Sequence, residues 1–244
     1  KLVKTIYETE PKIALVIDNF YRILDILYEN YKDESKENYQ DCDIKNRLIE
    51  IIQQLLRDAE NKEELLCQNG QTVVENGDII LIHSHSRSVT RVLREAYDHG
   101  IEFEVIIAEQ EFDKTLAILK LIQSKGIPVK VVPEYMLSHI ENEITKVFTG
   151  VVTLNSHMDF VASAGTLAVV SEFHLSKIPI YVFMTTAKMS LWKSHQKHHT
   201  YKVKNKRNSE LHHIEYERIK FSHDRVPLKY INHIVTEEGI FTPN

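Results

Sequence analysis

The chain has 244 residues, of which 43% are hydrophobic, and its formal net charge at pH 7 is −5. This length predicts one or two domains, and the hydrophobic fraction suffices for a sizeable buried core. We find no run of about eighteen apolar residues and no signal peptide, so we expect no membrane span. The acidic balance gives no general indication of nucleic-acid binding. The only cysteines, Cys42 and Cys67, lie in helical patterns, which favours a reduced, cytoplasmic protein in which they are packing residues.

Residues 1–76 are predicted to form a helical N-terminal subdomain. Apolar residues recur at spacings of three and four over 10–31, and again from about 43 to 74, with a charged break between the two stretches. These stripes predict a hairpin of two helices. No residue in the hairpin indicates chemistry, so we expect a role in packing or assembly.

From residue 77 the pattern changes to short apolar runs that alternate with helical stretches. The predicted strands are 79–82, 103–108, 129–132, 146–154 and 180–184, and the predicted helices between them are 88–99, 114–125, 135–143 and 165–176. Such alternation with short connections predicts a Rossmann-like, doubly wound, mostly parallel sheet with helices on both faces. We therefore assign residues 77–244 to one α/β domain.

The last fifty residues are expected to begin with a polar, basic excursion over 193–210. Five histidines lie in it or just after it, but their spacing matches no zinc site, so we interpret it as a solvated loop or a partner-binding surface. After it we expect a half-buried strand over 214–221, a helix over 226–239 and a short strand at 240–241.

The stretch IILIHSHSRSVTR, residues 79–91, is the candidate ligand site. A buried strand that passes through a polar turn into a helix is where α/β sheets bind ligands, and the N–H groups at such a helix start favour anions. His83, Ser84, Ser86 and Arg87 supply donors there, and the guanidinium of Arg87 suits a phosphate or carboxylate. The alternative for Arg87 is a structural ion pair with an acid such as Glu109.

Several stretches occur in an order that resembles one family. They are 77–93, 103–110, 126–132, 162–170, 178–189 and 231–243, the last of which contains TEEGIFTP. Their order and spacing resemble the alpha, beta and delta regulatory subunits of translation initiation factor two-B, their archaeal relatives, and the isomerases of methylthioribose-1-phosphate and ribose-1,5-bisphosphate. The resemblance covers about residues 77–243. It implies the Rossmann-like fold and a pocket of the kind that holds sugar phosphates.

Departures from the isomerase pattern indicate the subfamily. The isomerase turn resembles His-Cys-Asn-Ser, but residues 83–86 read His-Ser-His-Ser, so the catalytic cysteine position holds Ser84. The isomerases carry Gly-Ala-Asp after the fourth strand, and here the acidic position holds Val152; their later Asn-Lys is Ala-Ser at 162–163. Valine cannot transfer a proton, and serine without an adjacent base is a poor substitute for a thiolate. We therefore predict a member without catalytic residues, nearer to the initiation factor subunits.

The resemblance extends the candidate site beyond the first turn. The predicted ligand-binding residues are His83, Ser84, Ser86, Arg87, Glu109, Gly165, Thr166 and Lys188. The pair at 165–166 opens a helix that could hold an anion, and Lys188 matches a lysine of the family. The alternatives are a helix start with packing duties only and a simple surface charge. Gln110 and Glu111 stand where the family usually has serine and arginine, and Glu111 would repel an anion.

Three functional hypotheses follow. The first is a regulatory or binding protein, a homodimer through the α/β domain, with initiation factor 2 or related subunits as partners and a phosphorylated small molecule as ligand. The second is a sugar-phosphate isomerase with rearranged acid/base groups such as His85 and Glu109. The third is an assembly protein whose basic loop at 193–207 contacts RNA or an acidic partner. We expect no cofactor and no metal, because His83 and His85 lack a third ligand.

Overall fold

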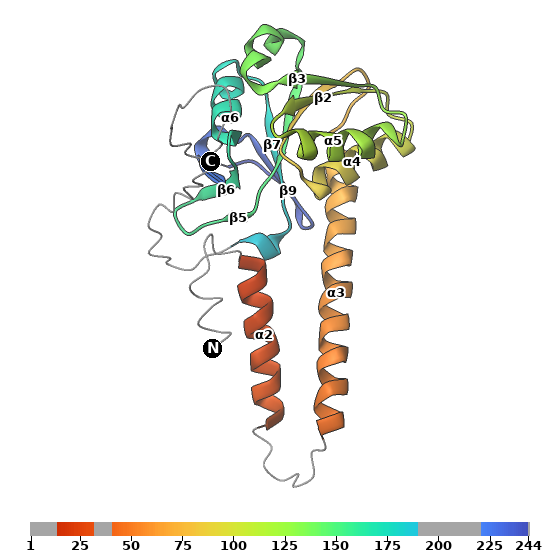
Figure 1. Ribbon diagram of the computed structural model, residues 1–244, viewed down its shortest axis with the longest axis vertical. Helices are drawn as coiled ribbons and strands as arrows, with labels where there is room; N and C mark the ends of the chain where they lie inside the picture. Colours follow the sequence, from red (N-terminus) through yellow and green to blue (C-terminus); the bar gives the residue numbers. More distant parts are fainter. Residues whose placement is uncertain (1–13, 32–40, 190–220, 244) are drawn as a thin grey trace, which may run out of the picture.

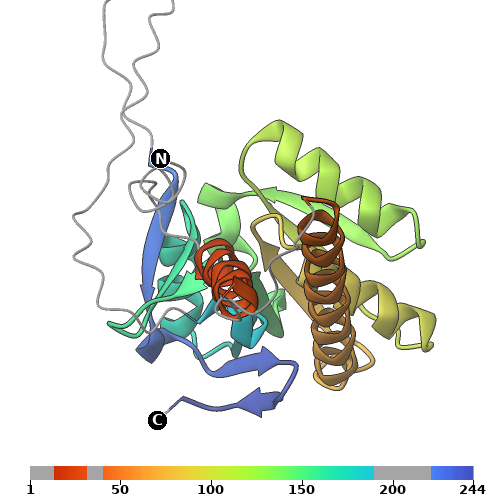
Figure 2. The ribbon, with the colours of Figure 1, turned by 90° about the horizontal axis from the view of Figure 1, so that it is seen from below.

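The structure is a computed structural model that describes residues 14–31, 41–189 and 221–243. Helices α2 (Ala14–Tyr31) and α3 (Asp41–Gln71) run antiparallel and project from an α/β part (Figure 1). Seen end-on in Figure 2, both helices leave the α/β part on the same side. The predicted helical hairpin is thereby confirmed. The N-terminal half of α3 extends beyond the sheet, whereas its C-terminal half packs against helix α4 (Arg87–Asp98).

A seven-stranded sheet with strand order β10-β9-β7-β4-β1-β2-β3 forms the centre of the α/β part. Its strands are β1 (Ile79–His83), β2 (Glu104–Glu109), β3 (Val129–Pro133), β4 (Lys146–Gly150), β7 (Ile180–Phe183), β9 (His233–Thr236) and β10 (Gly239–Phe241). All neighbours pair in parallel except β10, which pairs antiparallel with β9. The predicted mostly parallel sheet is confirmed.

Helices cover both faces of this sheet, as predicted. On one face α3, α4 (Arg87–Asp98) and α5 (Phe112–Gln123) share a core with inward-facing residues such as Ile80 and Ile82 of β1. On the other face α6 (Thr166–Leu175) packs in a core that includes Leu81. Because successive strand residues point to opposite faces, a central strand buried on both sides needs the unbroken apolar run that β1 has.

The core on the α3 side also holds Cys67, which is 2% exposed, as the sequence pattern predicted for a packing residue. Burial raises the pKa of its thiol to about 12, so the thiolate is strongly disfavoured. In the same core the rings of Phe148 and Phe183 lie 4.7 Å apart between centroids. These contacts fix α3 to the sheet through its C-terminal half.

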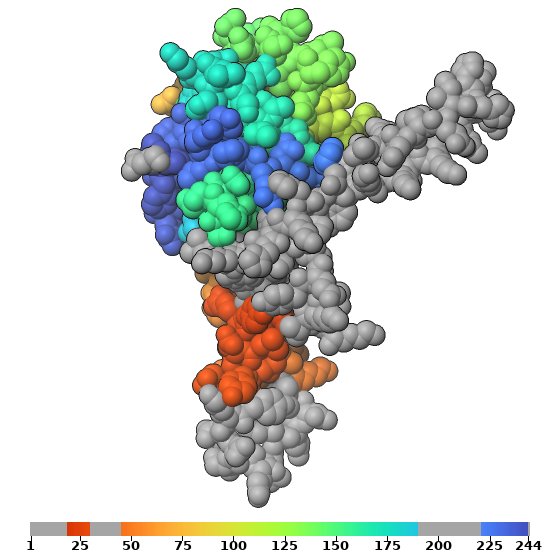
Figure 3. Space-filling view, turned by 90° about the vertical axis from the view of Figure 1, so that its left-hand side faces the viewer, coloured from red at the N-terminus to blue at the C-terminus, as the bar shows by residue number. Residues whose placement is uncertain are grey.

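A second, three-stranded antiparallel sheet was not predicted. It has the order β5-β6-β8 and consists of β5 (Thr153–Leu154), β6 (Asp159–Ser163) and β8 (His223–Pro227). The predicted strand 146–154 is therefore wrong as one element, because the chain leaves the main sheet after Gly150 and enters the second sheet at Thr153. Together with α6, this sheet covers one side of the molecule (Figure 3).

One predicted helix, 226–239, is wrong, and another, 135–143, is present only as 3-10 helix. The stretch 226–239 contains the end of β8, the 3-10 helix η4 (Leu228–Tyr230) and the whole of β9, and the stretch 135–143 lies in two 3-10 helices, η1 (Glu134–His139) and η2 (Glu141–Glu143). Pro227 has extended backbone angles, φ −59° and ψ 136°, and β9 pairs with β7, so a long-range strand contact prevails over the local helical spacing. The predicted excursion at 193–210 and all but the last residue of the predicted strand 214–221 lie outside the described residues.

A buried ion pair joins the N-terminal ends of β1 and β4. The Nζ atom of Lys146 lies 2.7 Å from Asp78 Oδ2 and 2.9 Å from Glu75 Oε2, and it also donates to the carbonyl of Val73 at 2.9 Å. Burial alone would lower the pKa of Lys146, but its hydrogen bonds to Asp78 and Glu75 outweigh burial and raise that pKa. This cluster lies at the edge of the sheet opposite to the candidate ligand site, and its role is structural.

Candidate functional site

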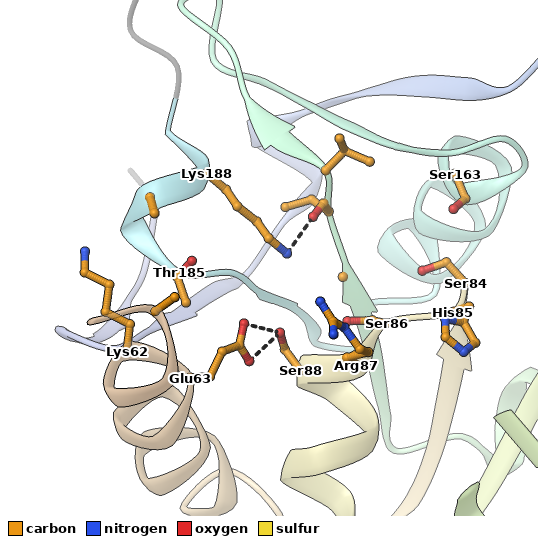
Figure 4. Close-up of a pocket in the computed structure, with 15 residues that line it drawn as sticks. Lys62, Glu63, Ser84, His85, Ser86, Arg87, Ser88, Ser163, Thr185 and Lys188 are labelled. Carbon is orange, nitrogen blue, oxygen red and sulfur yellow. Dashed lines mark hydrogen bonds between the residues drawn. The ribbon is translucent and has the colours of Figure 1, made fainter. Parts of the chain in front are cut away.

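A pocket of about 370 Å³ lies between α3 and the C-terminal ends of β1 and β4 (Figure 4). Its wall comes from five parts of the chain. Helix α3 contributes Ala59, Lys62 and Glu63, the turn after β1 contributes residues 84–88, the end of β4 contributes residues 150–152, and the 3-10 helix η3 (Thr186–Lys188) with its flank contributes Thr185, Ala187 and Lys188; Ser163 completes the lining. This volume suits a small metabolite.

The turn after β1 begins at a residue with an unusual backbone angle and leads to the N-terminus of α4, where two N–H groups have no partner among the described residues. Ser84 has φ 74°, in the left-handed region that non-glycine residues seldom adopt, and its carbonyl accepts a bond from Ser86 N–H at 3.1 Å. The hydroxyl of Ser86 caps α4 by accepting a bond from Val89 N–H at 3.3 Å. Among the described residues no acceptor meets the N–H groups of Arg87 and Ser88, which leaves them available to an anion.

Gly150 allows this turn to approach β4 closely. A Cβ atom added at Gly150 would lie 2.2 Å from Ser86 Oγ and 2.4 Å from Ser86 Cβ, which is closer than real contacts allow. The glycine is therefore needed for close packing and not for an unusual backbone angle.

Replacing Gly150 by alanine should force Ser86 out of its capping position. We expect Gly150→Ala to lower the free energy of unfolding by about 1–3 kcal/mol, the usual effect of overpacking, as measured by urea denaturation. Removing the Ser86 side chain in the same protein, as Gly150→Ala with Ser86→Gly, should restore most of the loss, since glycine is itself an adequate cap. A double variant as unstable as the single one would contradict this explanation.

The charged side chains of the wall differ in how they are paired. Arg87 is exposed and has no ion pair within the described part of the chain, so the predicted alternative of a pair with Glu109 does not form. Lys188 donates a hydrogen bond to the carbonyl of Val151 at 3.1 Å. Burial is the main cause that lowers the pKa of Lys188. The charge of Glu63 raises that pKa, and the charge of Arg87 lowers it further.

Helix α3 also brings a carboxylate to the wall. The two oxygens of Glu63 accept bonds from the hydroxyl of Ser88 at 3.1 and 3.0 Å, which links α3 to the first turn of α4 (Figure 4). Sequence reasoning missed this contribution because the hairpin was expected to serve packing alone. The helical spacing placed Lys62 and Glu63 on α3 but could not show which neighbour they face.

Glu237, in the TEEGIFTP stretch, links α3 to η3 through contacts with Lys62 and Thr186. Its side chain is 6% exposed; Oε1 lies 2.9 Å from Lys62 Nζ, and Oε2 accepts a bond from Thr186 N–H at 2.8 Å. The hydroxyl of Thr186 accepts a bond from Lys62 at 3.0 Å. Burial would raise the pKa of Glu237, but the hydrogen bonds from Thr186 and Lys62 outweigh it and lower that pKa. Two walls of the pocket are thus held together by one carboxylate.

This lowered pKa predicts a pH dependence of stability. Because the folded-state pKa lies below the unfolded-state value, Glu237 contributes stability above its unfolded pKa, and that contribution is lost as the pH falls through the folded pKa. We expect Glu237→Gln to lose less stability than the unaltered protein between about pH 6 and pH 3, as followed by urea midpoints. The exposed neighbour gives the control, because Glu238→Gln should leave this slope unchanged. Equal slopes for Glu237→Gln and the unaltered protein would refute the assignment.

His83 does not line the pocket. It is 1% exposed, and both ring nitrogens have protein partners: Nδ1 lies 3.1 Å from Thr166 Oγ1, while Nε2 lies 2.8 Å from Gln110 Nε2 and 3.2 Å from Glu134 Oε2. The amide of Gln110 also donates to the carbonyl of Ala164 at 2.9 Å. His83 therefore joins β1 to the start of α6 and to η1.

The start of α6 already holds a carboxylate of the protein. Gly165 N–H and Leu167 N–H both donate to Asp224 Oδ2 at 2.9 Å, so Asp224 of β8 occupies the place where an anion was expected. Gly165 is the N-cap residue, with φ 95°. Asp224 was missed because it lies 59 positions from Gly165 in the sequence and belongs to the sheet that was not predicted.

The eight predicted site residues thus fall into two groups. Ser84, Ser86, Arg87 and Lys188 line the pocket together. The other four lie outside its lining and are His83, Glu109, Gly165 and Thr166. Across the described ranges 14–31, 41–189 and 221–243, no three His, Cys, Asp or Glu side chains are arranged to hold a metal ion. In the same ranges, no helix has both the length and the apolar character needed to cross a membrane.

Known proteins resemble this chain in sequence and in fold. It is 26% identical to a translation initiation factor eIF-2B subunit 2-like protein of Pyrococcus furiosus, over 78% of this chain and 67% of the relative. It is 24% identical to a ribose 1,5-bisphosphate isomerase of the same organism, over 98% of this chain and 75% of the relative. The fold matches translation initiation factor eIF-2B of Pyrococcus horikoshii, with a TM-score of 0.72, 24% identity, and coverage of 80% and 70% of the two chains.

An isomerase structure shares the fold to a similar degree. The 5-methylthioribose 1-phosphate isomerase of Pyrococcus horikoshii gives a TM-score of 0.71 at 17% identity, covering 91% of this chain and 65% of the isomerase. Similarity of fold therefore does not separate the initiation factor subunits from the isomerases. The family itself is shown by a match that extends over residues 1–243. The chain belongs to the Initiation factor 2 subunit family.

Proposed function

We propose that this chain is a regulatory or binding member of its family that lacks isomerase activity, and that its pocket binds a phosphorylated small molecule. The composition of the pocket wall carries this proposal. Arg87 supplies positive charge and Lys188 supplies an amine donor beside the open N-terminus of α4. Ser84 and Val152 stand where the resemblance implies the cysteine and aspartate of the isomerases, and both line the pocket. The wall is therefore suited to bind an anion and poorly suited to move protons.

Isomerase activity remains the alternative, and the residues that line the pocket limit which acid and base could supply it. His85 lines the wall, but Glu109, its expected partner, does not. The carboxylate in the described lining is Glu63, which already accepts two bonds from Ser88. An acid/base pair would thus have to be His85 and Glu63, and Glu63 would have to leave Ser88.

A binding screen paired with a turnover assay tests the proposal. Ribose 5-phosphate and inorganic phosphate should raise the melting temperature, since a ligand that binds only the folded state stabilises it by an amount set by the ratio of its concentration to its Kd. Ribose 1,5-bisphosphate and methylthioribose 1-phosphate should remain unconverted after long incubation. Conversion of either substrate would overturn the non-catalytic part, and the absence of any stabilisation would overturn the binding part.

Restoring the two isomerase residues should not restore turnover. We expect Ser84→Cys combined with Val152→Asp to remain inactive on both sugar phosphates, because the residues after Glu109 also differ from the isomerase pattern. In the structure Gln110 is engaged with His83, and Glu111 is exposed. The measurement is product formation, with an isomerase of the family as positive control. Activity in the double variant would show a pocket closer to the enzymes than we propose.

We also propose that the protein acts in the cytoplasm as a homodimer formed through the α/β part, with initiation factor 2 or related subunits as partners. Support comes from a relative of the same fold, the tetrameric eIF2B-beta2-delta2 complex of Chaetomium thermophilum, at a TM-score of 0.69 and 19% identity. Sedimentation of the purified chain tests this, with a monomer at micromolar concentration as the contrary result.

A role of residues 193–207 in RNA binding, the remaining hypothesis, predicts RNA affinity that falls steeply with salt.

A further inference from the structure

Lys188 differs from the other buried or pocket-lining lysines of the described chain in having no carboxylate partner. Its Nζ atom donates to the neutral carbonyl of Val151 at 3.1 Å. In contrast, Lys62 in the same pocket is paired with Glu237 at 2.9 Å, and Lys146 is paired with Asp78 at 2.7 Å. An amine that is removed from water and bonded to no carboxylate favours its neutral, nucleophilic form. Burial lowers the pKa of Lys188, the charge of Glu63 opposes this without outweighing it, and the charge of Arg87 lowers that pKa further.

The pocket places an anion-binding surface opposite this amine. The ends of Lys188 and Arg87 extend toward the same part of the pocket in Figure 4, and the hydroxyls of Ser84 and Ser86 lie beyond them. The N–H groups at the start of α4 face no described acceptor. A phosphorylated molecule held there by its phosphate would therefore present the rest of its structure to the Lys188 amine.

We propose that Lys188 captures phosphorylated aldehydes by reversible formation of a Schiff base. The inference rests on the proposed function, because it narrows the proposed ligand to a molecule that carries both a phosphate and a free carbonyl group. It does not require turnover, since the imine is a bound state that hydrolysis reverses.

The step balances without a further reactant. The neutral amine attacks the carbonyl carbon, a C–N bond forms, and the electrons of the C=O π bond take up a proton at oxygen to give a carbinolamine. The nitrogen loses its protons as the hydroxyl leaves as water, so that amine and aldehyde become imine and one water molecule. No oxidation state changes in the sum.

Borohydride trapping tests the inference on the whole 244-residue chain. The protein is incubated at neutral pH with pyridoxal 5′-phosphate, reduced with sodium borohydride, and digested for peptide mass spectrometry. We expect the reduced adduct at Lys188 and its loss in Lys188→Arg, which keeps a basic side chain of similar length but cannot form an imine. Lys62 serves as the internal control, because its ion pair with Glu237 should leave it unlabelled. Pyridoxal without the phosphate should label Lys188 far less.

A parallel melting experiment separates the two proposals. Inorganic phosphate should stabilise the unaltered protein, and Lys188→Arg without ligand should unfold cooperatively at a melting temperature close to that of the unaltered protein, which shows that the variant is folded. Stabilisation by phosphate without an adduct at Lys188, or with equal labelling of Lys62 and Lys188, would overturn the Schiff base and leave the proposed binding function intact. Neither stabilisation nor adduct would overturn both.

Discussion

Replacing Lys146 by methionine should lower the free energy of unfolding by about 3–5 kcal/mol, the usual cost of removing one partner of a buried ion pair. Asp78 is 6% exposed and would be left at the N-terminal edge of the sheet without its cationic partner. Its remaining partners, the hydroxyl of Thr145 at 2.8 Å and the N–H of Glu75 at 2.8 Å, are neutral donors and do not replace the ammonium group. Urea denaturation followed by circular dichroism measures the difference.

Lys130, an exposed lysine of strand β3, provides the matched control. Lys130 lies 2.6 Å from Glu104, but its side chain is 57% exposed, so water replaces the lost contact in Lys130→Met. We expect that variant to unfold at nearly the same urea concentration as the unaltered protein. If Lys146→Met were as stable as Lys130→Met, the ion pair at the base of the sheet would not be structural.

Replacing Arg87 by methionine should weaken the binding of ribose 5-phosphate by about 10- to 150-fold. This range corresponds to the roughly 1.5–3 kcal/mol of a hydrogen bond to a charged group. Arg87 lines the pocket at the start of α4, and within the described residues no carboxylate competes for its guanidinium. Isothermal titration calorimetry would give both affinities.

Arg91 on the same helix makes the comparison specific. It is paired with Glu64 and does not line the pocket, so Arg91→Met changes the charge of the protein equally without removing a group from the site. We expect it to bind ribose 5-phosphate as the unaltered protein does. Equal weakening in both variants would mean that the effect of Arg87 is general electrostatic attraction and not contact with the ligand.

The sequence predicted the main sheet because its signals are local. In β1 and β2 an unbroken apolar run marks a strand buried on both faces, and glycines at 100 and 126 mark the returns between helices and strands. The turn at 83–87 was recognised for the same reason, since strand, polar turn and helix start are adjacent in the chain. Three of the eight predicted site residues, Ser84, Ser86 and Arg87, lie together in the pocket on that basis, and Lys188, which the family resemblance indicated, lines it with them.

The remainder of the fold and site depends on contacts between distant parts of the chain. The segment 226–239 has apolar residues at spacings that fit a helix, yet β8 pairs with β6, and β9 with β7. Asp224 meets the start of α6 across 59 positions, and Lys62 meets Thr186 across 124. Periodicity within one element carries no signal for such partners, which is why the second sheet and the α3 wall of the pocket were not predicted.

We propose that the pocket binds a phosphorylated small molecule without isomerising it. Phosphorus NMR of the protein mixed with one equivalent of ribose 1,5-bisphosphate tests both halves in one sample. We predict that the phosphorus resonances shift or broaden on mixing, return on displacement by excess inorganic phosphate, and give no product resonances. Product resonances growing faster than in a protein-free sample, or resonances that do not respond to the protein at all, would contradict the claim.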